Sequence, residues 1–403
     1  MAQRPQFAGW LNDTNDVTAT FLAAGQIPGL INLGGGLPDP STYPAAELSA
    51  LAGRAIEEHP HATLNYPPID GLPALRDLLA KRFTTDTLHL TRDNVIITSG
   101  GMQALDLVGK VLVDAGQTVT CQSPAYLGAI DAWKPRLPSY RPIKLEDDNL
   151  NLTAAFTGAQ FAYTVPNFSN PSGRLVNLEQ RKAIVDAAHA TGTWLVEDDP
   201  YGSLYLDGEP LPRLLDLSAA YNPGPYDGPV IYMGTFSKEV APGLRIGWIV
   251  AAPEMIAALK TAKQGSDMCS SGLSQQVVIG AFEQRLPEKI LPNVLTTYRA
   301  RRDALLEAMD EHLSPFYQWE RPVGGMFVWA RARDPMLDTN ALLKEGLSHG
   351  VCISPSSVFD PEGIDRGAVR INFTLNAEGK LREGARRLAV ATASLVSKHR
   401  QAA

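Results

Sequence analysis

The chain has 403 residues, of which 44% are apolar and 20% are charged, and its formal net charge is −7. These values are ordinary for a soluble globular protein, and the length allows about two domains. The acidic balance argues against surfaces that bind nucleic acid or anionic membranes, so we expect neither as a partner. The sequence has no apolar leader and no long apolar run, which predicts a cytoplasmic protein.

The cysteine and histidine patterns give no sign of metal or redox chemistry. Cys121, Cys269 and Cys352 are far apart and form no C-x-x-C pair, which favours buried thiols. The seven histidines form no H-x-x-x-H pair, so we expect no metal site. Any catalytic chemistry is therefore expected from other residue types.

From about residue 94 onward, short β-branched segments alternate with amphipathic ones. The pattern predicts strands at residues 94–98, 117–121, 160–165, 193–197, 230–233 and 246–250, and helices at 102–113 and 178–191. Such alternation is typical of an α/β fold with a mainly parallel sheet covered by helices. Ligands of these sheets bind beyond the carboxyl ends of the strands, so the residues that follow each strand are the candidate site.

The two ends of the chain have different patterns. The last third predicts a long helix at 287–313, strands at 326–330 and 369–373, and helices at 339–349 and 378–398, which together are typical of an α+β domain. The N-terminal region, with its Gly34–Pro38 segment, is too irregular to predict a core element. We therefore predict three parts: an arm over residues 1–45 that packs on the second domain or on a partner subunit, a large domain over 46–284 and a small domain over 285–403.

The segment Thr235-Phe236-Ser237-Lys238, with Arg245 seven residues further on, combines an amine, two hydroxyls and a fixed cation. A lysine that forms a Schiff base with pyridoxal 5′-phosphate (PLP) needs such neighbours, because they neutralise the phosphate dianion. Nearby cations and burial would also lower the pKa of Lys238 and favour its nucleophilic form. Taken alone, the motif also fits an ordinary surface loop.

Four other strand ends carry residues that fit the same cofactor. Ser99-Gly100-Gly101-Met102 opens a helix whose backbone N–H groups would bind a phosphate. Tyr126 could stack on the pyridine ring, and Asn170 could donate its amide to the ring's phenolic oxygen. Asp198 could pair with the pyridine nitrogen and keep it protonated, while Tyr201 could bond the same oxygen as Asn170. Each motif by itself also fits a turn or core packing.

In combination and in order, these motifs resemble those of the fold-type I PLP enzymes, specifically the class I/II aminotransferases. The matching motifs are Ser99-Gly100-Gly101-Met102-Gln103-Ala104-Leu105, Asn170-Pro171-Ser172-Gly173, Glu197-Asp198-Asp199-Pro200-Tyr201, and Ser237-Lys238 with Gly243-Leu244-Arg245-Ile246-Gly247-Trp248. The resemblance covers roughly residue 30 to the end. It implies a mainly parallel seven-stranded sheet with helices on both faces, plus a smaller α+β C-terminal domain. Its Gly-Gly-Leu-Pro and Glu-Asp-Asp-Pro-Tyr motifs are similar to those of the 2-aminoadipate aminotransferase subgroup.

The resemblance also implies roles for residues outside the sheet. Arg370 looks like the arginine that binds the substrate α-carboxylate, and Gly36 resembles the loop whose backbone approaches that group. Tyr66 resembles the tyrosine that reaches the cofactor phosphate of the neighbouring subunit, which implies a homodimer with shared active sites. The implied site thus comprises Lys238 as the catalytic residue; Gly100, Gly101, Met102, Tyr126, Asn170, Asp198, Tyr201, Thr235, Ser237, Arg245 and Tyr66 around the cofactor; and Gly36, Asn170 and Arg370 around the substrate.

Two features depart from the family pattern. Met102 replaces a polar residue that is common in the phosphate loop, so only its backbone N–H can serve there. No Lys or Arg occurs between Arg4 and Arg54, where relatives can carry an arginine for acidic side chains. The sequence therefore predicts ping-pong transfer of the amino group of a neutral, apolar or aromatic amino acid to a 2-oxo acid, with Lys238 moving the proton from Cα.

Two alternatives remain open. A PLP-dependent carbon–sulfur lyase would use the same residues, because the reaction depends on which Cα bond is perpendicular to the ring. Some transcription factors carry an aminotransferase-like domain, which binds a ligand, behind a winged helix-turn-helix. The aminotransferase-like region here starts by about residue 30, so we expect too few preceding residues for that module.

Overall fold

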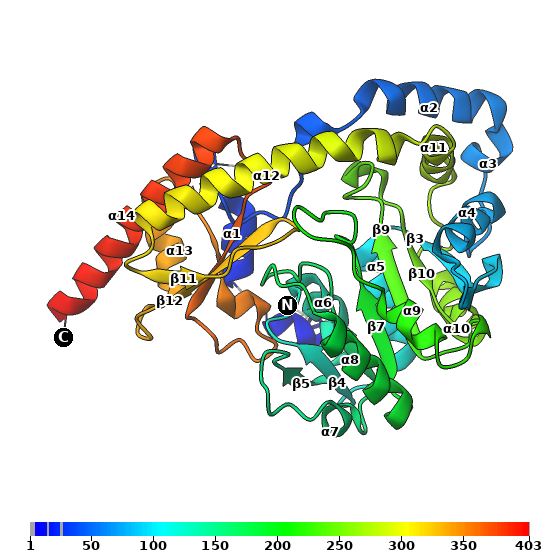
Figure 1. Ribbon diagram of the computed structural model, residues 1–403, viewed down its shortest axis with the longest axis horizontal. Coiled ribbons are helices and arrows are strands. Elements are labelled where there is room, and N and C mark those ends of the chain that lie inside the picture. Colours follow the sequence, from blue (N-terminus) through cyan, green and yellow to red (C-terminus); the bar gives the residue numbers. More distant parts are fainter. Residues whose placement is uncertain (1–4, 14–15, 25–26, 403) are drawn as a thin grey trace.

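The computed structural model describes residues 5–13, 16–24 and 27–402. Residues 1–4, 14–15 and 25–26 of the predicted arm, and residue 403, lie outside the described residues. Figure 1 shows two groups of elements joined by the long helix α12 (Leu286–His312), one built on a seven-stranded sheet and one on a four-stranded sheet. No helix in the described ranges is both long enough and apolar enough to cross a bilayer.

The seven-stranded sheet has the order β3-β10-β9-β7-β6-β4-β5. Its strands are β3 (Val95–Thr98), β4 (Thr118–Gln122), β5 (Ser139–Ile143), β6 (Phe161–Thr164), β7 (Trp194–Asp198), β9 (Val230–Thr235) and β10 (Gly247–Val250). Strand β10 is antiparallel to β3 and β9, whereas the pairs from β9 to β5 are parallel. The predicted mainly parallel sheet is confirmed, and β5 is an additional edge strand.

Helices cover both faces of this sheet because successive residues of each strand point to opposite faces. Ile96 of β3 belongs to one apolar cluster, whereas Val95 and Ile97 belong to another. The first cluster includes residues of α5 (Gly101–Leu112), α6 (Leu127–Trp133) and α10 (Pro253–Gln264). The second includes residues of α4 (Pro73–Phe83), α7 (Leu152–Phe156), α8 (Leu178–Thr191), α9 (Leu214–Ala219) and α11 (Gly272–Glu283). Helices α2 (Ala45–Glu58) and α3 (Pro60–Leu64) pack against α11.

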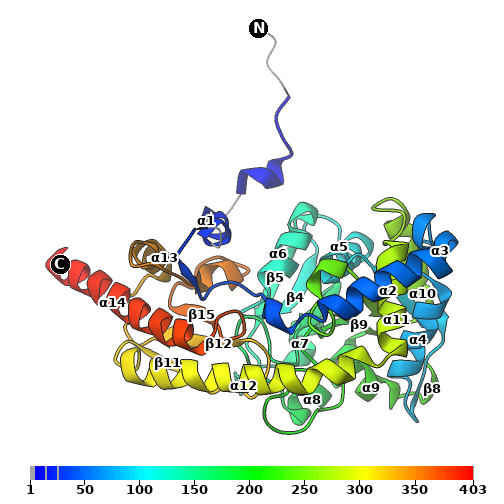
Figure 2. The ribbon, with the colours of Figure 1, turned by 90° about the horizontal axis from the view of Figure 1, so that it is seen from above.

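The second group surrounds an antiparallel sheet with the order β11-β12-β15-β14. Its strands are β11 (Tyr317–Trp319), β12 (Phe327–Ala332), β14 (Ser354–Pro355) and β15 (Ala368–Asn372), and its helices are α12, α13 (Thr339–Ser348) and α14 (Glu378–Ala402). Helices α12 and α14 pack side by side, as Figures 1 and 2 show. The predicted α+β organisation of the last third is confirmed.

The N-terminal region contributes to this second group. Strand β1 (Ile31–Asn32) pairs in parallel with β13 (Val351–Cys352), and Ile31 and Leu33 are buried. The expectation that this region holds no core element is therefore wrong at β1, because a two-residue strand is too short to show a periodic pattern. Helix α1 (Asp16–Ala24) lies against α13. A further short pair, β2 (Leu88–His89) with β8 (Gly224–Pro225), and 3-10 helices at Gly9–Asp13, Pro40–Thr42, Arg92–Asn94, Lys134–Arg136, Pro242–Leu244 and Ser356–Phe359 complete the elements.

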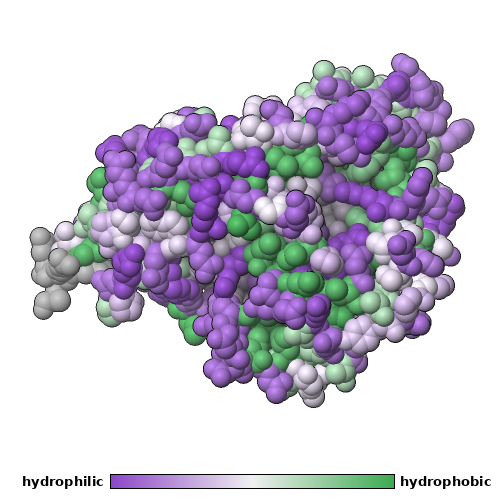
Figure 3. Space-filling view, in the orientation of Figure 1, coloured by the Kyte–Doolittle hydropathy of each residue, from purple (hydrophilic) through white to green (hydrophobic). Residues whose placement is uncertain are grey.

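The exposed apolar side chains are concentrated near the start of the chain. Figure 2 shows residues 5–13 extending away from the body of the molecule, and Phe7 is 86% exposed. Among the described residues of the first 66, the large exposed apolar side chains are those of Phe7, Leu11, Ile27, Leu37, Ile56, Leu64 and Tyr66. On the face seen in Figure 3, polar residues predominate, with apolar patches between them near the lower centre.

Candidate active site

Lys238 follows strand β9, at the carboxyl edge of the seven-stranded sheet. Its side chain is half-buried, and Nζ donates a hydrogen bond to the carbonyl oxygen of Gly36 at 3.2 Å. Burial lowers the pKa of Lys238 from 10.5 to about 8, and the charges of Arg370 and Arg245 add to this shift. The sequence-based expectation of a lowered pKa is confirmed. A sizeable fraction of this amine is therefore neutral near physiological pH and available as a nucleophile or base.

The two hydroxyls of the same segment stabilise the turn that carries Lys238. Thr235 Oγ1 lies 2.9 Å from Ser237 Oγ and accepts a hydrogen bond from the backbone N–H of Ser237 at 3.2 Å. Thr235 Oγ1 also donates to the carbonyl oxygen of Ile246 at 3.2 Å, which links the end of β9 to the start of β10. The structure thus brings both hydroxyls to the base of the loop between Lys238 and Arg245.

The turn before α5 has the geometry of an anion-binding site. Gly100 has a φ of +88°, a backbone conformation that favours glycine, and its α-carbon lies close to the Arg245 guanidinium, because a Cβ there would be 2.4 Å from Nη2. Gly101 and Met102 open α5, where the first N–H groups have no acceptor within the helix. Arg245 is exposed beside them, and its Nη2 lies 3.4 Å from the carbonyl oxygen of Ser99. Backbone donors and a guanidinium therefore converge, which suits a phosphate.

Three consecutive acidic residues end strand β7, but their hydrogen bonds differ. Both carboxylate oxygens of Glu197 accept backbone N–H groups at the start of α9, from Leu214 and Leu215 at 2.8 and 2.9 Å. Asp199 accepts from the Asn167 amide at 2.9 Å and from the Tyr232 hydroxyl at 3.3 Å. These two residues are therefore held by the protein itself.

Asp198 is the member of the three with a spare oxygen. Its Oδ2 accepts a hydrogen bond from the Tyr163 hydroxyl at 2.8 Å, and no bond to Oδ1 is recorded among the described residues. Burial raises the pKa of Asp198 from 3.8 to about 7, while the Tyr163 bond opposes the rise. A buried carboxylate of this kind gains most from a cationic partner, such as a protonated ring nitrogen.

Arg370 lies in β15 with only 2% of its surface exposed. Its Nη1 donates to Asn170 Oδ1 at 2.7 Å, and its Nη2 donates to the carbonyl oxygen of Gly34 at 2.5 Å and to Ser354 Oγ at 3.3 Å. Its Nε is buried and has no hydrogen-bond partner among the described residues. The guanidinium therefore retains donors that its surroundings do not use.

The charge of Arg370 is also uncompensated. Phe327 and Phe359 flank the guanidinium, with ring centroids 4.4 and 4.7 Å from Cζ, and no ion pair of Arg370 is recorded in the described part of the chain. Burial lowers the pKa of Arg370 to about 10, so the group remains charged at neutral pH. A buried cation without an acidic partner fits an anionic ligand such as a carboxylate.

Asn170, Tyr201 and Tyr126 lie near Arg370, and the two tyrosines also interact with Asp198. The amide oxygen of Asn170 is engaged by Arg370, which leaves its amide nitrogen to donate. Tyr201 is 4% exposed, and burial raises its pKa while a hydrogen bond with Asn170 opposes the rise. Tyr126 precedes α6, its hydroxyl lies 3.6 Å from the Met102 sulfur, and burial raises its pKa to about 12. These phenols are protonated and can donate at neutral pH.

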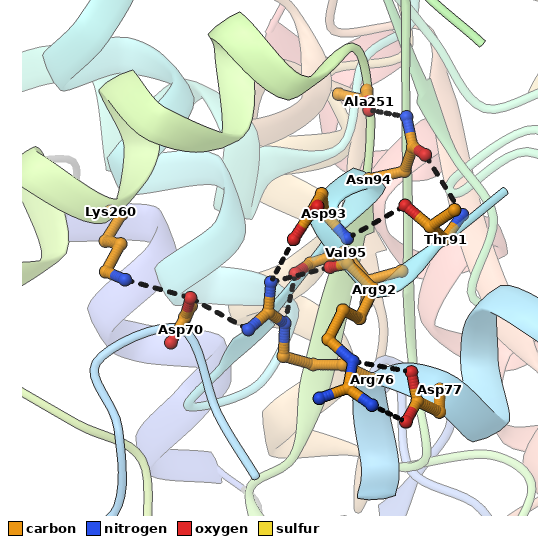
Figure 4. A network of polar contacts seen from close by, with 10 residues as sticks. All are labelled: Asp70, Arg76, Asp77, Thr91, Arg92, Asp93, Asn94, Val95, Ala251 and Lys260. Atoms are coloured by element: carbon orange, nitrogen blue, oxygen red, sulfur yellow. Dashed lines mark hydrogen bonds and ion pairs between the residues drawn. The ribbon is translucent and has the colours of Figure 1, made fainter. Parts of the chain in front are cut away.

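Tyr66 is not brought to this site within one chain. Its side chain is 79% exposed, and the recorded hydrogen bonds of the described residues do not join it to the other site residues. Four residues further on, Asp70 is buried, and its Oδ2 accepts from Arg76 at 2.8 Å and from Lys260 at 3.0 Å, as Figure 4 shows. Arg76 also donates to the carbonyl oxygen of Val95. The segment after Tyr66 is therefore firmly attached to β3 and α10.

Sequence reasoning missed several residues that complete the site. Tyr163, which bonds Asp198, and Phe327, which flanks Arg370, look like ordinary core residues of strands. Ser354 lies 16 residues before Arg370, and no local motif connects them. Such contacts are visible only once the elements are placed in space.

Comparison with known proteins identifies the family of this chain. Residues 28–388 match the family described as aminotransferase class I and II, and the chain belongs to this family. It is therefore a PLP-dependent aminotransferase of fold type I, and its reaction is the ping-pong transamination general for the family. The predicted fold class, reaction type and cofactor are confirmed.

Individual relatives cover nearly the whole chain. The chain is 36% identical over 372 residues to aromatic-amino-acid aminotransferase 1 from Thermococcus litoralis, covering 89% of this chain and 87% of that protein. It is 34% identical over 378 residues to 2-aminoadipate transaminase from Thermus thermophilus, covering 92% of each. A crystal structure of kynurenine aminotransferase from Pyrococcus horikoshii superposes with a TM-score of 0.87 at 32% identity, covering 96% of this chain and 97% of that one.

Proposed function

We propose that the amino donor is a neutral, apolar or aromatic amino acid and that Lys238, Asp198 and Arg370 carry the reaction. The observation that supports this most directly is the buried guanidinium of Arg370, which has unused donors and no recorded acidic partner. This guanidinium provides a site for one carboxylate group, the α-carboxylate of the substrate. The nearby Arg301 is already paired with Asp39 at 2.7 Å, so it is poorly placed to bind a second carboxylate on a substrate side chain.

Each residue of the proposed site has a physical task. PLP, when bound, supplies an electron-withdrawing ring that stabilises negative charge at the substrate Cα. Lys238 Nζ removes the proton from Cα, for which its lowered pKa suits it. Asp198 keeps the ring nitrogen protonated, and Arg370 fixes the substrate α-carboxylate beside the backbone of Gly36.

The remaining residues hold and orient the cofactor. We assign its phosphate to the N–H groups that follow Gly100, in Gly101 and Met102, together with the hydroxyls of Thr235 and Ser237 and the guanidinium of Arg245. We assign the ring to Tyr126, which would cover one face, and to Asn170 and Tyr201, which would donate to the phenolic oxygen. These assignments rest on the convergence of donors described above.

We also propose that two chains share their active sites, with Tyr66 of one chain reaching the phosphate of the other. The exposed phenol of Tyr66 and the concentration of exposed apolar residues in the first 66 residues support such an interface. A mixture of Lys238→Ala and Tyr66→Phe chains would test it. A mixed dimer has one site with both changes and one with neither, so mixing should restore PLP affinity and activity. Lack of recovery in a mixture shown to contain mixed dimers would contradict shared sites.

We also propose the division of the chain into an arm, a large domain and a small domain, and a cytoplasmic location for the protein. The seven-stranded sheet lies within residues 95–250 and the four-stranded sheet within 317–372, which supports boundaries near residues 45 and 285. Cys121 and Cys269 are free thiols, as is usual in a reducing compartment, which supports a cytoplasmic location.

A donor panel tests the substrate class. With 2-oxoglutarate or pyruvate as acceptor, we expect phenylalanine or leucine to exceed aspartate and glutamate by about tenfold or more in kcat/KM, because a second carboxylate would be desolvated without a partner. Aspartate or glutamate as the best donor would overturn the proposal. Release of pyruvate from a cysteine conjugate without any acceptor would instead indicate the lyase reaction. Borohydride reduction followed by peptide mapping should place the pyridoxyl group on Lys238.

A further inference from the structure

A second lysine lies beside the turn Ser99–Met102 before α5, to which we assigned the cofactor phosphate and which we call the phosphate turn. This lysine takes no part in the chemistry described above. Lys263, in α10, has a side chain with 0% exposure. Its Nζ donates to Asp267 Oδ1 at 2.6 Å, to Gln103 Oε1 at 2.8 Å and to Ser270 Oγ at 3.1 Å. An ammonium group has three donors, so each of them has an acceptor. A buried charge that is satisfied so completely holds its acceptors in one arrangement.

The acceptors of Lys263 are the residues that hold the phosphate turn. Gln103 Oε1 also accepts the backbone N–H of Ser99 at 2.7 Å, and Asp267 Oδ2 accepts the Ser99 hydroxyl at 2.7 Å. Ser99 is therefore fixed through both its backbone and its side chain. Gln103 is the third residue of α5, and its side chain accepts the backbone N–H of Ser99. The backbone N–H groups of Gly101 and Met102 are left free to bind an anion.

Pre-alignment of the backbone N–H groups is especially important in this chain, because of the residue at position 102. Met102 offers no polar side chain to a phosphate, so binding at this position depends on backbone N–H groups. Glycine is the most flexible residue type, so ordering Gly100 and Gly101 when the ligand binds would cost conformational entropy and weaken binding. A turn that is already ordered avoids that cost.

We propose that Lys263 is a positioning residue that pre-aligns the N–H groups of Gly101 and Met102 for the cofactor phosphate, acting through Gln103, Asp267 and Ser99. The inference rests on the proposed assignment of this turn to the phosphate. It predicts a specific defect: loss of Lys263 weakens the contribution of the phosphate group to binding, and not the binding of the ring.

Titration with two ligands separates the contribution of the phosphate group to binding from that of the ring. Apoprotein prepared from the holoenzyme is titrated with PLP and with pyridoxal, which lacks the phosphate, and the ratio of the two dissociation constants is compared between variants. For Lys263→Met we expect the pyridoxal-to-PLP ratio to fall by about tenfold, with the pyridoxal constant nearly unchanged. An unchanged ratio would overturn the proposal. If both dissociation constants rose by the same factor, Lys263 would have a merely structural role.

The chain provides a matched control in Lys110. This lysine also forms an i,i+4 pair with an aspartate, although here the aspartate comes first: Lys110 Nζ donates to Asp106 Oδ2 at 2.7 Å. Its Nζ also donates to Ser266 Oγ at 3.3 Å, and no hydrogen bond from it to Ser99, Gln103 or Asp267 is recorded among the described residues. Lys110→Met should leave the ratio unchanged. If Lys263→Met does not fold, Ser99→Ala decides the matter, because it removes the hydroxyl link to Asp267 and leaves Lys263 in place. Ser99→Ala should lower the ratio by about threefold, and an unchanged ratio would contradict the proposal.

The same titrations distinguish this inference from the proposed function. If the unmodified protein binds pyridoxal as tightly as PLP, the turn is not a phosphate site and the assignment under the proposed function fails. If it prefers PLP and Lys263→Met keeps that preference, only the role of Lys263 fails.

Discussion

Each part of the proposed cofactor side lies in a local motif at one strand end, whereas the guanidinium of the substrate side is held by distant parts of the chain. Around Lys238, the hydroxyls of Thr235 and Ser237 interact two residues apart. Around Arg370, the guanidinium bonds Asn170 and Gly34, which are 200 and 336 residues away. The first arrangement follows from single strand ends, and the second exists only when the two groups of elements pack together.

The two sides also differ in charge balance. Lys263, below the phosphate turn, is paired with Asp267, whereas the buried Arg370 has no recorded acidic partner among the described residues. The support below the phosphate turn is therefore satisfied by the protein itself, whereas the substrate side keeps an unpaired charge for its ligand. Changes on the two sides should consequently affect different measurements, which the following predictions test.

The largest effect is expected at Lys238, where the two sides meet. Under the proposed function, Lys238→Ala removes the amine that both attaches the cofactor and takes the Cα proton, so we expect kcat to fall by about 10⁴-fold or more. Steady-state assays and borohydride peptide mapping should show loss of both activity and pyridoxyl-lysine. Lys182→Ala, an exposed lysine paired with Glu179 on α8, serves as the control and should retain both. Activity of Lys238→Ala within tenfold of the unmodified enzyme would contradict the assignment.

Arg370→Lys is expected to damage the substrate side alone. A lysine keeps the charge but loses the planar fork that binds a carboxylate through two hydrogen bonds, so kcat/KM should fall by about 100-fold. The affinity for PLP, measured by titration of the apoprotein, should change little. Arg331→Lys on the neighbouring strand β12, which is exposed and paired with Asp365 at 2.8 Å, is the matched control and should keep kcat/KM. A parallel loss of PLP affinity in Arg370→Lys would break the distinction between the two sides.

The lowered pKa of Lys238 predicts how the free amine depends on pH. Below pH 8 the ammonium form dominates, so the rate at which apoprotein captures pyridoxal covalently should rise by about tenfold per pH unit. Above a pKa of about 8 the amine is already neutral and the rate should level off. An exposed lysine would continue to gain up to about pH 10.5. Stopped-flow absorbance from pH 6 to 10 would locate the midpoint, and a rate still rising at pH 10 would contradict the burial of this amine.

Much of the cofactor side could be predicted from the sequence because each part lies in one local motif. Buried β-branched strands predicted the sheet, and the turns that follow them predicted Gly100, Asn170 and Asp198 as candidate site residues. Strand β5 was not predicted, because Ser139–Ile143 is a half-exposed edge strand that contains a proline. Helices α4 and α10 were also not predicted, although each begins with a proline, a recognised helix-start signal.

The substrate side and the supporting contacts could not be predicted from local patterns. The sequence places three acidic residues at one strand end, but only the positions of α9, Asn167 and Tyr232 show that Glu197 and Asp199 are already satisfied. Lys263 lies within a helix and resembles a surface lysine until its burial is seen. Such residues act through contacts across the fold, which leave no spacing in the sequence.

The smallest effect is expected at Tyr163, which sharpens the comparison within the cofactor side. Its hydroxyl donates to Asp198 Oδ2 at 2.8 Å and favours the ionised carboxylate. Tyr163→Phe should therefore raise the pKa of Asp198 further, reduce the ionised fraction near neutral pH, and lower kcat by about fivefold at pH 7. Because a higher pH restores the ionised form, the acidic limb of the kcat profile should move to higher pH and the loss should shrink above it.

Tyr232→Phe is the matched control for this prediction. Tyr232 donates to the neighbouring Asp199 at 3.3 Å, so the change removes an equally buried hydroxyl from an acid that has another donor in Asn167. A structural defect common to both tyrosines would lower kcat in both variants without moving the pH profile. A shift confined to Tyr163→Phe would show that the hydroxyl acts through the ionisation of Asp198, whereas equal shifts in the two variants would remove the special position of Asp198 among the three carboxylates.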